Sequence, residues 1–405
     1  MAQASRVVRI RAMTRSIRAL FLSSVVLAAF GCGGGDETGP GSDGGTVSPS
    51  GVPLHIAAGG RHTCVVMPDR TVRCWGAGNA SQLGQGRSGD LSVATAVPGL
   101  TGVSDIAMGY EFSCARMESG AASCWGANPG GALGNGGSDI MVSPTPVMLD
   151  DVERFGAFTQ GHYSSCAIHD GGTLSCWGDA SRGQLGIGVV DMEDHALPVE
   201  VNVGAAVHLA LGYFHVCVAL ASGSVSCFGS NGWGELGNDD LGSEPEPSPV
   251  TAIGIEDTRQ LAAGQQFTCA ILADGGVSCW GDNRNGQLGD GTTNFSTTPK
   301  TIVGFGDVAQ IATGRKHTCA VTEGGELYCW GRNEEGQLGD GTTTERHVPT
   351  LVEGLSGVRE VALGDLHTCA LLGSGAVRCF GSNSNGQLGD GTTRDSDEPT
   401  YVLWE

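Results

Sequence analysis

Short apolar runs and glycine-rich polar segments alternate along the chain from Leu54 to the C-terminus, and this pattern returns seven times. In the sixth repeat the apolar runs predict four strands, at 308–312, 317–322, 326–331 and about 348–352. The middle two strands are separated by Glu323-Gly324-Gly325, and glycine there supplies the positive φ that a three-residue hairpin loop needs. Each repeat is therefore expected to be a unit of four short strands.

Three landmarks recur at fixed places in every repeat. The first is a pair of cysteines ten residues apart, and successive pairs begin 50 to 52 residues apart. The second cysteine is followed by Trp or Phe and then Gly, with the aromatic residues at Trp75, Trp125, Trp177, Phe228, Trp280, Trp330 and Phe380. A Leu-Gly pair comes later, with the leucines at Leu83, Leu133, Leu185, Leu236, Leu288, Leu338 and Leu388. Agreement at this many positions identifies an internal repeat.

The spacing of the cysteines has a geometric cause in the predicted hairpin. With the turn of the sixth repeat at its centre, Cys319 lies directly opposite Cys329, at a distance that a disulfide can span. Zinc sites favour shorter spacings such as C-x2-C, which do not occur here, whereas free buried thiols remain an alternative in a reducing compartment. The expected disulfides are Cys64–Cys74, Cys114–Cys124, Cys166–Cys176, Cys217–Cys227, Cys269–Cys279, Cys319–Cys329 and Cys369–Cys379.

The repeat pattern Gly-x-x-His-[Thr/Ser]-Cys…Cys-Trp-Gly-x-Asn-x-x-Gly-Gln-Leu-Gly resembles that of the regulator of chromosome condensation family over about residues 54–405. The resemblance implies an all-β, seven-bladed propeller. The cysteines depart from the eukaryotic pattern, where small residues usually occupy those sites, and imply an exported variant with one disulfide per repeat. Four-stranded repeats of about 50 residues fit propeller blades on their own account. Since the chain begins on a first strand (54–58) and ends on a fourth (399–403), the last blade is expected to close next to the first, with the Trp and Leu landmarks packed between blades.

The N-terminal segment predicts export. Residues 1–31 contain five arginines and then an apolar run at 19–30 that is too short to span a membrane, as in a bacterial signal peptide. The run ends Ala29-Phe30-Gly31-Cys32, which resembles a lipoprotein signal, so Cys32 is the expected lipidation site. Fifteen cysteines also leave Cys32 outside the seven pairs. Cleavage after Gly31 with plain secretion is the alternative, and residues 32–53 are expected to form a flexible Gly/Ser/Pro tether.

Composition narrows the class of partner. The chain has 43 acidic residues against 22 Lys and Arg, giving a net charge of −21. An acidic surface repels phosphate backbones, so nucleic acid is not an expected partner.

The recurring polar residues predict structural roles. Four repeats carry a histidine two residues before the first cysteine: His62, His215, His317 and His367. The other three repeats have Phe112, Phe267 and Ser164 at this position, so we do not expect the histidines to bind metal. Aspartates between glycines are expected in turns, because a calcium loop needs several oxygen ligands; they are Asp290, Asp340 and Asp390. The sequence contains no Walker motif, nucleophile elbow or HExxH, and predicts neither catalytic residues nor a cofactor.

The loops after the first strand break the symmetry of the repeats. Aromatic residues gather there on repeats two to four, and Trp233 interrupts the loop pattern later in repeat four. Because Tyr and Trp are enriched at binding hot spots, these residues predict a binding patch; they are Tyr110, Tyr163, Tyr213, Phe214 and Trp233. The acidic loops of repeats three and four lie beside it in sequence, at Asp191, Glu193, Asp194, Asp239, Asp240, Glu244 and Glu246.

These observations favour a monomeric, non-enzymatic scaffold of the bacterial cell envelope. We expect it to be anchored by lipid, with the outer membrane as the expected membrane, or else to be secreted. It is expected to bind an unidentified protein through loops on one end of the propeller. A lectin-like propeller that stacks aromatic side chains on sugars is the alternative, and an enzyme comes third.

Overall fold

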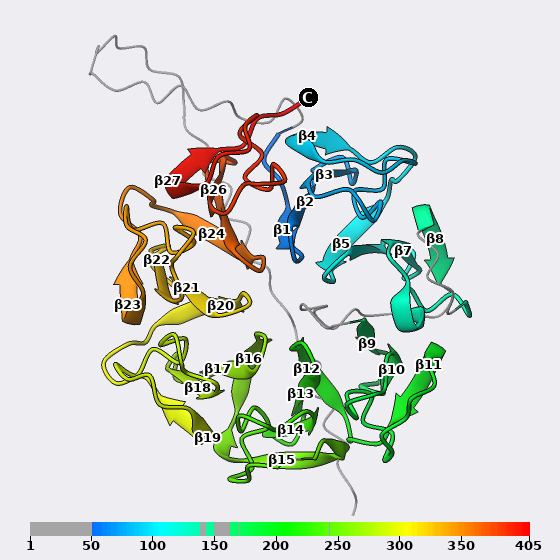
Figure 1. Cartoon of the computed structure of the whole chain (residues 1–405), viewed down its shortest axis with the longest axis vertical. Helices are drawn as coiled ribbons and strands as arrows, with labels where there is room; N and C mark the ends of the chain where they lie inside the picture. The colour runs from blue at the N-terminus through cyan, green and yellow to red at the C-terminus, as the bar shows by residue number, and fades with distance from the viewer. Residues whose placement is uncertain (1–50, 138–142, 150–162, 170, 243) are drawn as a thin grey trace, which may run out of the picture. The chain divides into compact units, whose positions relative to one another are not determined.

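The computed structural model describes residues 51–137, 143–149, 163–169, 171–242 and 244–405, and within them seven antiparallel sheets form a ring of blades (Figure 1). Blade 1 comprises β1 (His55–Ala58), β2 (His62–Val66), β3 (Val72–Gly76) and β4 (Leu91–Ala96). Blade 2 comprises β5 (Val103–Met108), β6 (Phe112–Met117), β7 (Ala122–Gly126) and β8 (Ser143–Leu149). Blade 3 comprises β9 (Ser164–Ile168), β10 (Leu174–Gly178) and β11 (His195–Val201). A 3-10 helix, η1 (Pro129–Gly131), lies between β7 and β8.

Blade 4 comprises β12 (Ala206–Leu211), β13 (His215–Leu220), β14 (Ser224–Gly229) and β15 (Glu246–Glu256), and blade 5 comprises β16 (Thr258–Ala263), β17 (Phe267–Leu272), β18 (Val277–Gly281) and β19 (Ser296–Thr301). Blade 6 comprises β20 (Val308–Thr313), β21 (His317–Thr322), β22 (Leu327–Gly331) and β23 (Arg346–Leu351). Blade 7 comprises β24 (Val358–Leu363), β25 (His367–Leu372), β26 (Val377–Gly381) and β27 (Ser396–Tyr401). The strands of each blade follow one another from the centre outwards in chain order. The sheet of blade 3 has three strands among the described residues. Residues 150–162 lie outside the described residues, as do the predicted signal peptide, Cys32 and residues 32–50. The predicted seven-bladed propeller is confirmed.

The hairpin register places all seven cysteine pairs in disulfides. Cys319 on β21 is the direct partner of Cys329 on β22, and the same register holds in every blade. All seven expected bonds are present, and all fourteen cysteines are completely buried. Each bond therefore joins the second and third strands of one blade, and none joins two blades.

Neighbouring blades share apolar clusters and one repeated polar contact. The clusters combine the leucine of one blade with the aromatic landmark of the next, as Leu288 and Trp330 do between blades 5 and 6. The backbone carbonyl of the residue before that leucine accepts hydrogen bonds from the next blade: the Gln287 oxygen accepts from Trp330 Nε1 at 2.9 Å and from Thr318 Oγ1 at 3.0 Å. Paired donors of this kind recur on the carbonyls of Gln82, Ala132 and Glu235.

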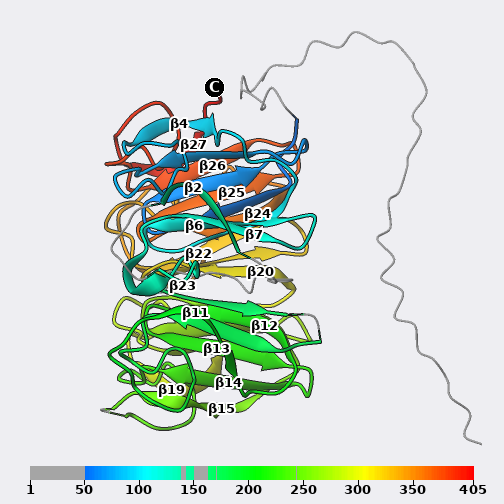
Figure 2. The same ribbon diagram turned by 90° about the vertical axis from the view of Figure 1, so that its right-hand side faces the viewer.

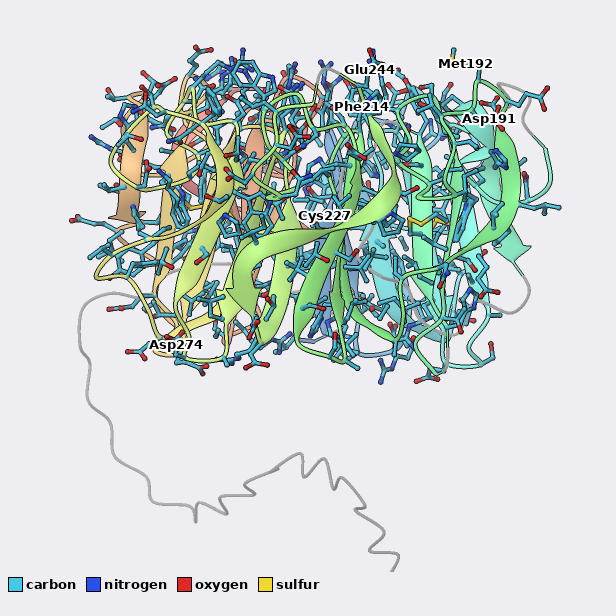
Figure 3. The ribbon with its side chains drawn as sticks, turned by 90° about the horizontal axis from the view of Figure 1, so that it is seen from below. Asp191, Met192, Phe214, Cys227, Glu244 and Asp274 are labelled. Carbon is cyan, nitrogen blue, oxygen red and sulfur yellow. A yellow bond between two sulfur atoms is a disulfide. The ribbon has the colours of Figure 1, made fainter. Side chains whose placement is uncertain are left out.

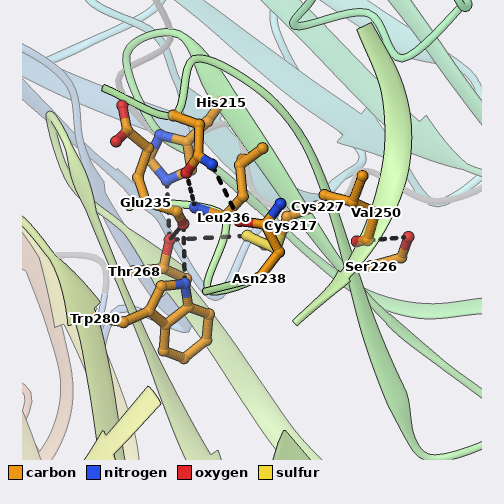
Figure 4. Close-up of a disulfide and its surroundings, with 11 residues drawn as sticks. His215, Cys217, Ser226, Cys227, Glu235, Leu236, Asn238, Val250, Thr268 and Trp280 are labelled. Carbon is orange, nitrogen blue, oxygen red and sulfur yellow. Dashed lines mark hydrogen bonds between the residues drawn. A yellow bond between two sulfur atoms is a disulfide. The ribbon is translucent and has the colours of Figure 1, made fainter. Parts of the chain in front are cut away.

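The four recurring histidines extend this contact and are completely buried, as their predicted structural role requires. His317 Nε2 lies 3.0 Å from the Thr368 hydroxyl of the next blade, and that hydroxyl donates its proton to the Gln337 carbonyl oxygen. The histidine must therefore be the donor, so its Nε2 carries a proton. The lowered pKa keeps the ring neutral near pH 7. Burial lowers the pKa of each of the four to about 3; they are His62, His215, His317 and His367. Figure 4 shows the equivalent contact of His215 with Thr268, beside Trp280 and the Glu235 carbonyl.

The ring closes between blades 7 and 1. Trp404 forms a parallel bridge with Ala94 on β4, where the Ala94 amide donates to the Leu403 oxygen at 2.9 Å. The Trp404 ring meets Trp75 edge to face at a centroid distance of 6.4 Å, and Figure 2 shows the C-terminus beside β4. The last blade is thus joined to the first by non-covalent contacts, as expected.

The outer strands manage their open edges in two ways. Six of them contain proline, which cannot donate a ladder hydrogen bond and so discourages pairing with another chain; they are β8, β11, β15, β19, β23 and β27. The seventh, β4, has none, and its edge is the one that Leu403 to Glu405 cover.

We expect substitution of His317 by Phe to reduce the sensitivity of the fold to acid. Because the pKa of His317 is about 3 when folded and near 6.5 when unfolded, the stability that the neutral ring contributes is present above pH 6.5 and is lost as the pH falls towards 3. Phe occupies this slot in blades 2 and 5, so His317→Phe should fold. Between pH 6 and 4, the free energy of unfolding should fall less steeply in the variant than in the wild type, by about 1.4 kcal/mol per pH unit. Urea unfolding at pH 7, 6, 5 and 4 measures this, and parallel curves for the two proteins would contradict it.

Candidate functional site

The loops of the propeller divide between its two ends. The inner loops join the first and second strands of each blade, and the outer loops join the third and fourth; both emerge at one end, which we name the loop face. The hairpin turns between the second and third strands emerge at the other end, the turn face. Figure 3 shows Phe214, Asp191, Met192 and Glu244 at the loop face and Asp274 at the turn face.

Buried amides hold the outer loops in shape. Asn283 is completely buried; its Oδ1 accepts from the Leu288 amide at 2.9 Å, and its Nδ2 donates to Asp290 Oδ1 at 3.1 Å. Asp290 Oδ1 also accepts from the Thr292 amide, which confirms the turn role predicted for this aspartate. Asn333 and Asn383 repeat the arrangement. Among the described residues no group of three or more His, Cys, Asp or Glu side chains could hold a metal ion.

Blade 4 replaces the buried glutamine of this loop with a carboxylate. Glu235 Oε2 accepts from the Trp233 amide at 2.7 Å, and Oε1 accepts from the Ser230 hydroxyl at 3.0 Å. The side chain is 1% exposed, and burial raises the pKa of its carboxyl group. Glu235 therefore fixes the backbone that carries Trp233.

Trp233 is half-buried in a cluster that bridges blades 4 and 5. The guanidinium of Arg284 lies 3.9 Å from the centre of the indole ring and is held there by two hydrogen bonds to Asp282. Phe295 meets Trp233 edge to face at 6.1 Å, and its side chain is 43% exposed. Trp233 was predicted from the sequence, whereas Phe295 and Arg284 were not. A signal for Phe295 was available, because its slot holds Glu345 and Asp395 in the next two blades.

The prediction that Tyr213 is an exposed binding residue is wrong. Tyr213 is 4% exposed, and its hydroxyl donates to Asp365 Oδ1 at 2.8 Å. Asp365 belongs to the inner loop of blade 7, so this bond spans the ring from blade 4 near its centre (Figure 1). Burial raises the pKa of Asp365 to about 6, against the opposing effects of the Tyr213 hydrogen bond, Arg315 and Arg61. Burial and the nearby carboxylate also raise the pKa of Tyr213.

The other inner-loop aromatics are half-buried. The Tyr110 ring lies against Gly60, where an added Cβ would come within 2.7 Å of it. The guanidinium of Arg182 lies 6.0 Å from the centre of the Phe214 ring. Burial raises the pKa of Tyr163, with contributions from Glu111 and Tyr110. The five predicted aromatics thus form two groups: Tyr110, Tyr163, Tyr213 and Phe214 on the inner loops, and Trp233 on an outer loop with Phe295.

The most exposed apolar side chains of the loop face lie on the outer loops of blades 3 to 5. Met192 is 82% exposed and Leu241 is 49% exposed, and neither was among the binding residues predicted from the sequence. Met192 lies between Asp191 and Glu193 in the sequence, and Leu241 follows Asp240. Figure 3 shows Met192 and Asp191 side by side at the loop face. We name Met192, Leu241 and Phe295, together with Trp233 in edge-to-face contact with Phe295, the outer-loop patch.

Residues 148–404 match the RCC1-like domain, and residues 54–82 and 103–131 match the regulator of chromosome condensation (RCC1) repeat. The chain belongs to the RCC1-like domain family. Two solved structures share the fold with little sequence identity. Yeast RCC1 (Prp20) bound to Kap60 has a TM-score of 0.72 at 21% identity, over 93% of this chain and 91% of that one. Human WBSCR16 has a TM-score of 0.70 at 22% identity, over 78% and 85% of the two chains.

Curated relatives of this RCC1-like chain match over part of their length. The ultraviolet-B receptor UVR8 of Arabidopsis thaliana is 30% identical over 247 residues, which are 59% of this chain and 55% of the receptor. The human probable E3 ubiquitin-protein ligase HERC3 is 32% identical over 137 residues, which are 33% of this chain and 13% of the ligase.

Removal of the Tyr213 hydroxyl should destabilise the propeller more at pH 8 than at pH 5. The hydroxyl stabilises the ionised form of Asp365, so in Tyr213→Phe the pKa of Asp365 should rise above about 6. A loss of roughly 1–3 kcal/mol is expected at pH 8, where the buried carboxylate lacks its donor, and a smaller loss at pH 5, where the carboxyl group is protonated. Denaturant unfolding at both pH values measures this. Tyr328→Phe, at a half-buried tyrosine of blade 6, is the matched control, and an equal loss at both pH values would refute the assignment.

Proposed function

We propose that this RCC1-like propeller is a non-enzymatic scaffold of the cell envelope that binds a protein partner through the outer-loop patch. The observation that carries the proposal is the exposure of Met192, Leu241 and Phe295 on three neighbouring blades. None of the three belongs to a core cluster, and exposed apolar side chains on one face are a feature of protein-binding surfaces.

The rigidity of the loops supports this function. Buried Asn and Gln amides, with Glu235 in blade 4, fix the loop backbones before any partner arrives. A preordered surface loses less conformational entropy on binding, so more of the contact energy contributes to affinity.

The non-enzymatic part of the proposal rests on how the buried acids are used. Glu235 and Asp365 have raised pKa values, which in another setting would suggest acid–base chemistry. Each, however, accepts hydrogen bonds within the fold, Glu235 from Ser230 and Trp233 and Asp365 from Tyr213. Both groups are therefore assigned structural roles.

Export is supported by the seven buried disulfides, which fit an oxidising compartment. Among the described residues no helix is long and apolar enough to cross a membrane. Attachment is proposed to come from Cys32, through lipidation at the end of the signal peptide.

The lipid anchor predicts that Cys32→Ser moves the protein from the membrane fraction to the soluble fraction. Mass spectrometry of the wild-type N-terminal peptide should find an acylated Cys32. A soluble wild-type chain with an unmodified cysteine, or with cleavage elsewhere, would support plain secretion instead.

The protein-binding function is tested by photo-crosslinking in the cells that make the protein. A photoreactive amino acid replaces Phe295, and in a control chain it replaces Ile253, which is 52% exposed on the outer strand of blade 4. The Phe295 probe should give a discrete protein adduct, which Met192→Glu with Leu241→Glu should reduce at least about tenfold. The two substitutions are at exposed sites and should shift stability by no more than about 0.5 kcal/mol.

An adduct that is unaffected by these two substitutions would refute the outer-loop patch as the interface. Binding to a glycan array that depends on Trp233 and Phe295, with no protein adduct, would favour the carbohydrate-binding alternative. Arg284 already covers one face of the Trp233 ring, which leaves less of that ring for stacking on a sugar.

A further inference from the structure

A groove of about 1230 Å³ runs along the outer wall between blades 5 and 6. Its sides are the outer strands β19 and β23 and the connection from Ile302 to Asp307, which leads from one blade to the next. It extends from Asp290 of an outer loop to Asp274 of a hairpin turn. The groove therefore follows the height of the wall and is separate from the outer-loop patch.

Apolar side chains line this groove and remain open to solvent. Val303 is 96% exposed and Val348 is 52% exposed. Phe305 and Tyr328 are half-buried and meet edge to face at a centroid distance of 5.3 Å. Phe305 and Tyr328 also pack against the core of the joint, whereas the exposure of Val303 and Val348 is not required by that packing.

The next joint around the ring shows what packing alone requires. The repeat places Glu353, Leu355, Arg378 and Glu398 where this joint has Val303, Phe305, Tyr328 and Val348. Leu355 is 7% exposed and belongs to the core of its joint, and the other three are charged. The same backbone is thus compatible with a charged outer wall, and the apolar groove is a local departure from it.

The charge around the groove is strongly one-sided. Its lining includes the carboxylates of Asp274, Asp290, Asp307 and Glu326 and a single cation, Lys300. Within the described part of the chain, none of these four acids has an ion-pair partner. An occupant with Lys or Arg beside its apolar side chains would complement both features.

We propose that this groove binds an extended segment of another protein in which bulky aliphatic side chains alternate with lysine or arginine. The aliphatic side chains contact Val303, Phe305 and Val348, and the basic side chains pair with Asp307, Glu326 and Asp274. The segment is extended because the lining follows the direction of β19 and β23 from one end of the blade towards the other.

The test uses the purified chain and a fluorescent nonapeptide of alternating lysine and leucine, with alternating glutamate and leucine as the control peptide. Fluorescence anisotropy should show binding of the basic peptide and at least about tenfold weaker binding of the acidic one. Val303→Glu with Val348→Glu installs the residues of the next joint and should weaken binding at least about tenfold, although the protein becomes more acidic. General charge attraction would instead make the more acidic variant bind the basic peptide more tightly, so weaker binding indicates apolar contact.

Two further variants complete the design. Asp307→Asn with Glu326→Gln should weaken binding about threefold or more at low salt and flatten its salt dependence. Met192→Glu with Leu241→Glu, on the loop face, should leave binding of the basic peptide unchanged. The groove proposal and the proposed function are therefore tested independently. Hydrogen exchange on the wild-type chain should show peptide-dependent protection at 301–307 and 346–350, which tests the site even if a variant folds poorly. Equal binding by wild type and Val303→Glu/Val348→Glu, or protection confined to the loop face, would overturn the proposal.

Discussion

At six of the seven joints, one backbone carbonyl of an outer loop accepts a hydrogen bond from the next blade; at joint 7/1 the donor to the Gln387 carbonyl is Trp75 Nε1 alone. At four joints it accepts from both a tryptophan indole and a hydroxyl of the following blade, inside an apolar cluster that excludes water. A buried carbonyl without a donor would cost about 1–3 kcal/mol, so the contact fixes the spacing and angle between blades. At joint 6/7, Phe380 takes the tryptophan position and Thr368 alone donates. At joint 3/4, Phe228 and Val216 occupy both donor positions, and packing in an apolar cluster takes the place of the polar contact.

Much of this architecture was predictable because it repeats. Seven copies of the cysteine pair at one spacing predict the hairpin register, and with it the disulfides. In the sixth blade the second strand has its predicted limits, whereas the outer strand begins at Arg346, two residues before the predicted start. Arg346 and His347 are polar, so the apolar run did not mark where the strand began.

The site was harder to predict because it depends on where the repeats differ. Nothing local to Tyr213 indicates that its hydroxyl meets Asp365, 152 residues away, since that bond exists only once the ring has closed. Met192 and Leu241 lie in outer loops that vary between repeats, so no periodicity marks them as exposed. Phe295 and Val303 could have been found by comparison with Glu345 and Glu353 in the next blade. In a symmetric fold, an apolar residue in a slot that is charged elsewhere is therefore informative.

The proline-free edge of β4 has a consequence for assembly. A strand edge with free amides and carbonyls is a template for any other extended chain, including the same strand of a second copy. The contact of residues 403–405 with this edge occupies the template from within the molecule. If residues 403–405 detached from β4, each ring would expose one unpaired strand edge. Two such rings could then pair edge to edge in a continuous intermolecular sheet. The contact of residues 403–405 with Ala94 thus joins the last blade to the first and also covers the outer-strand edge that lacks proline.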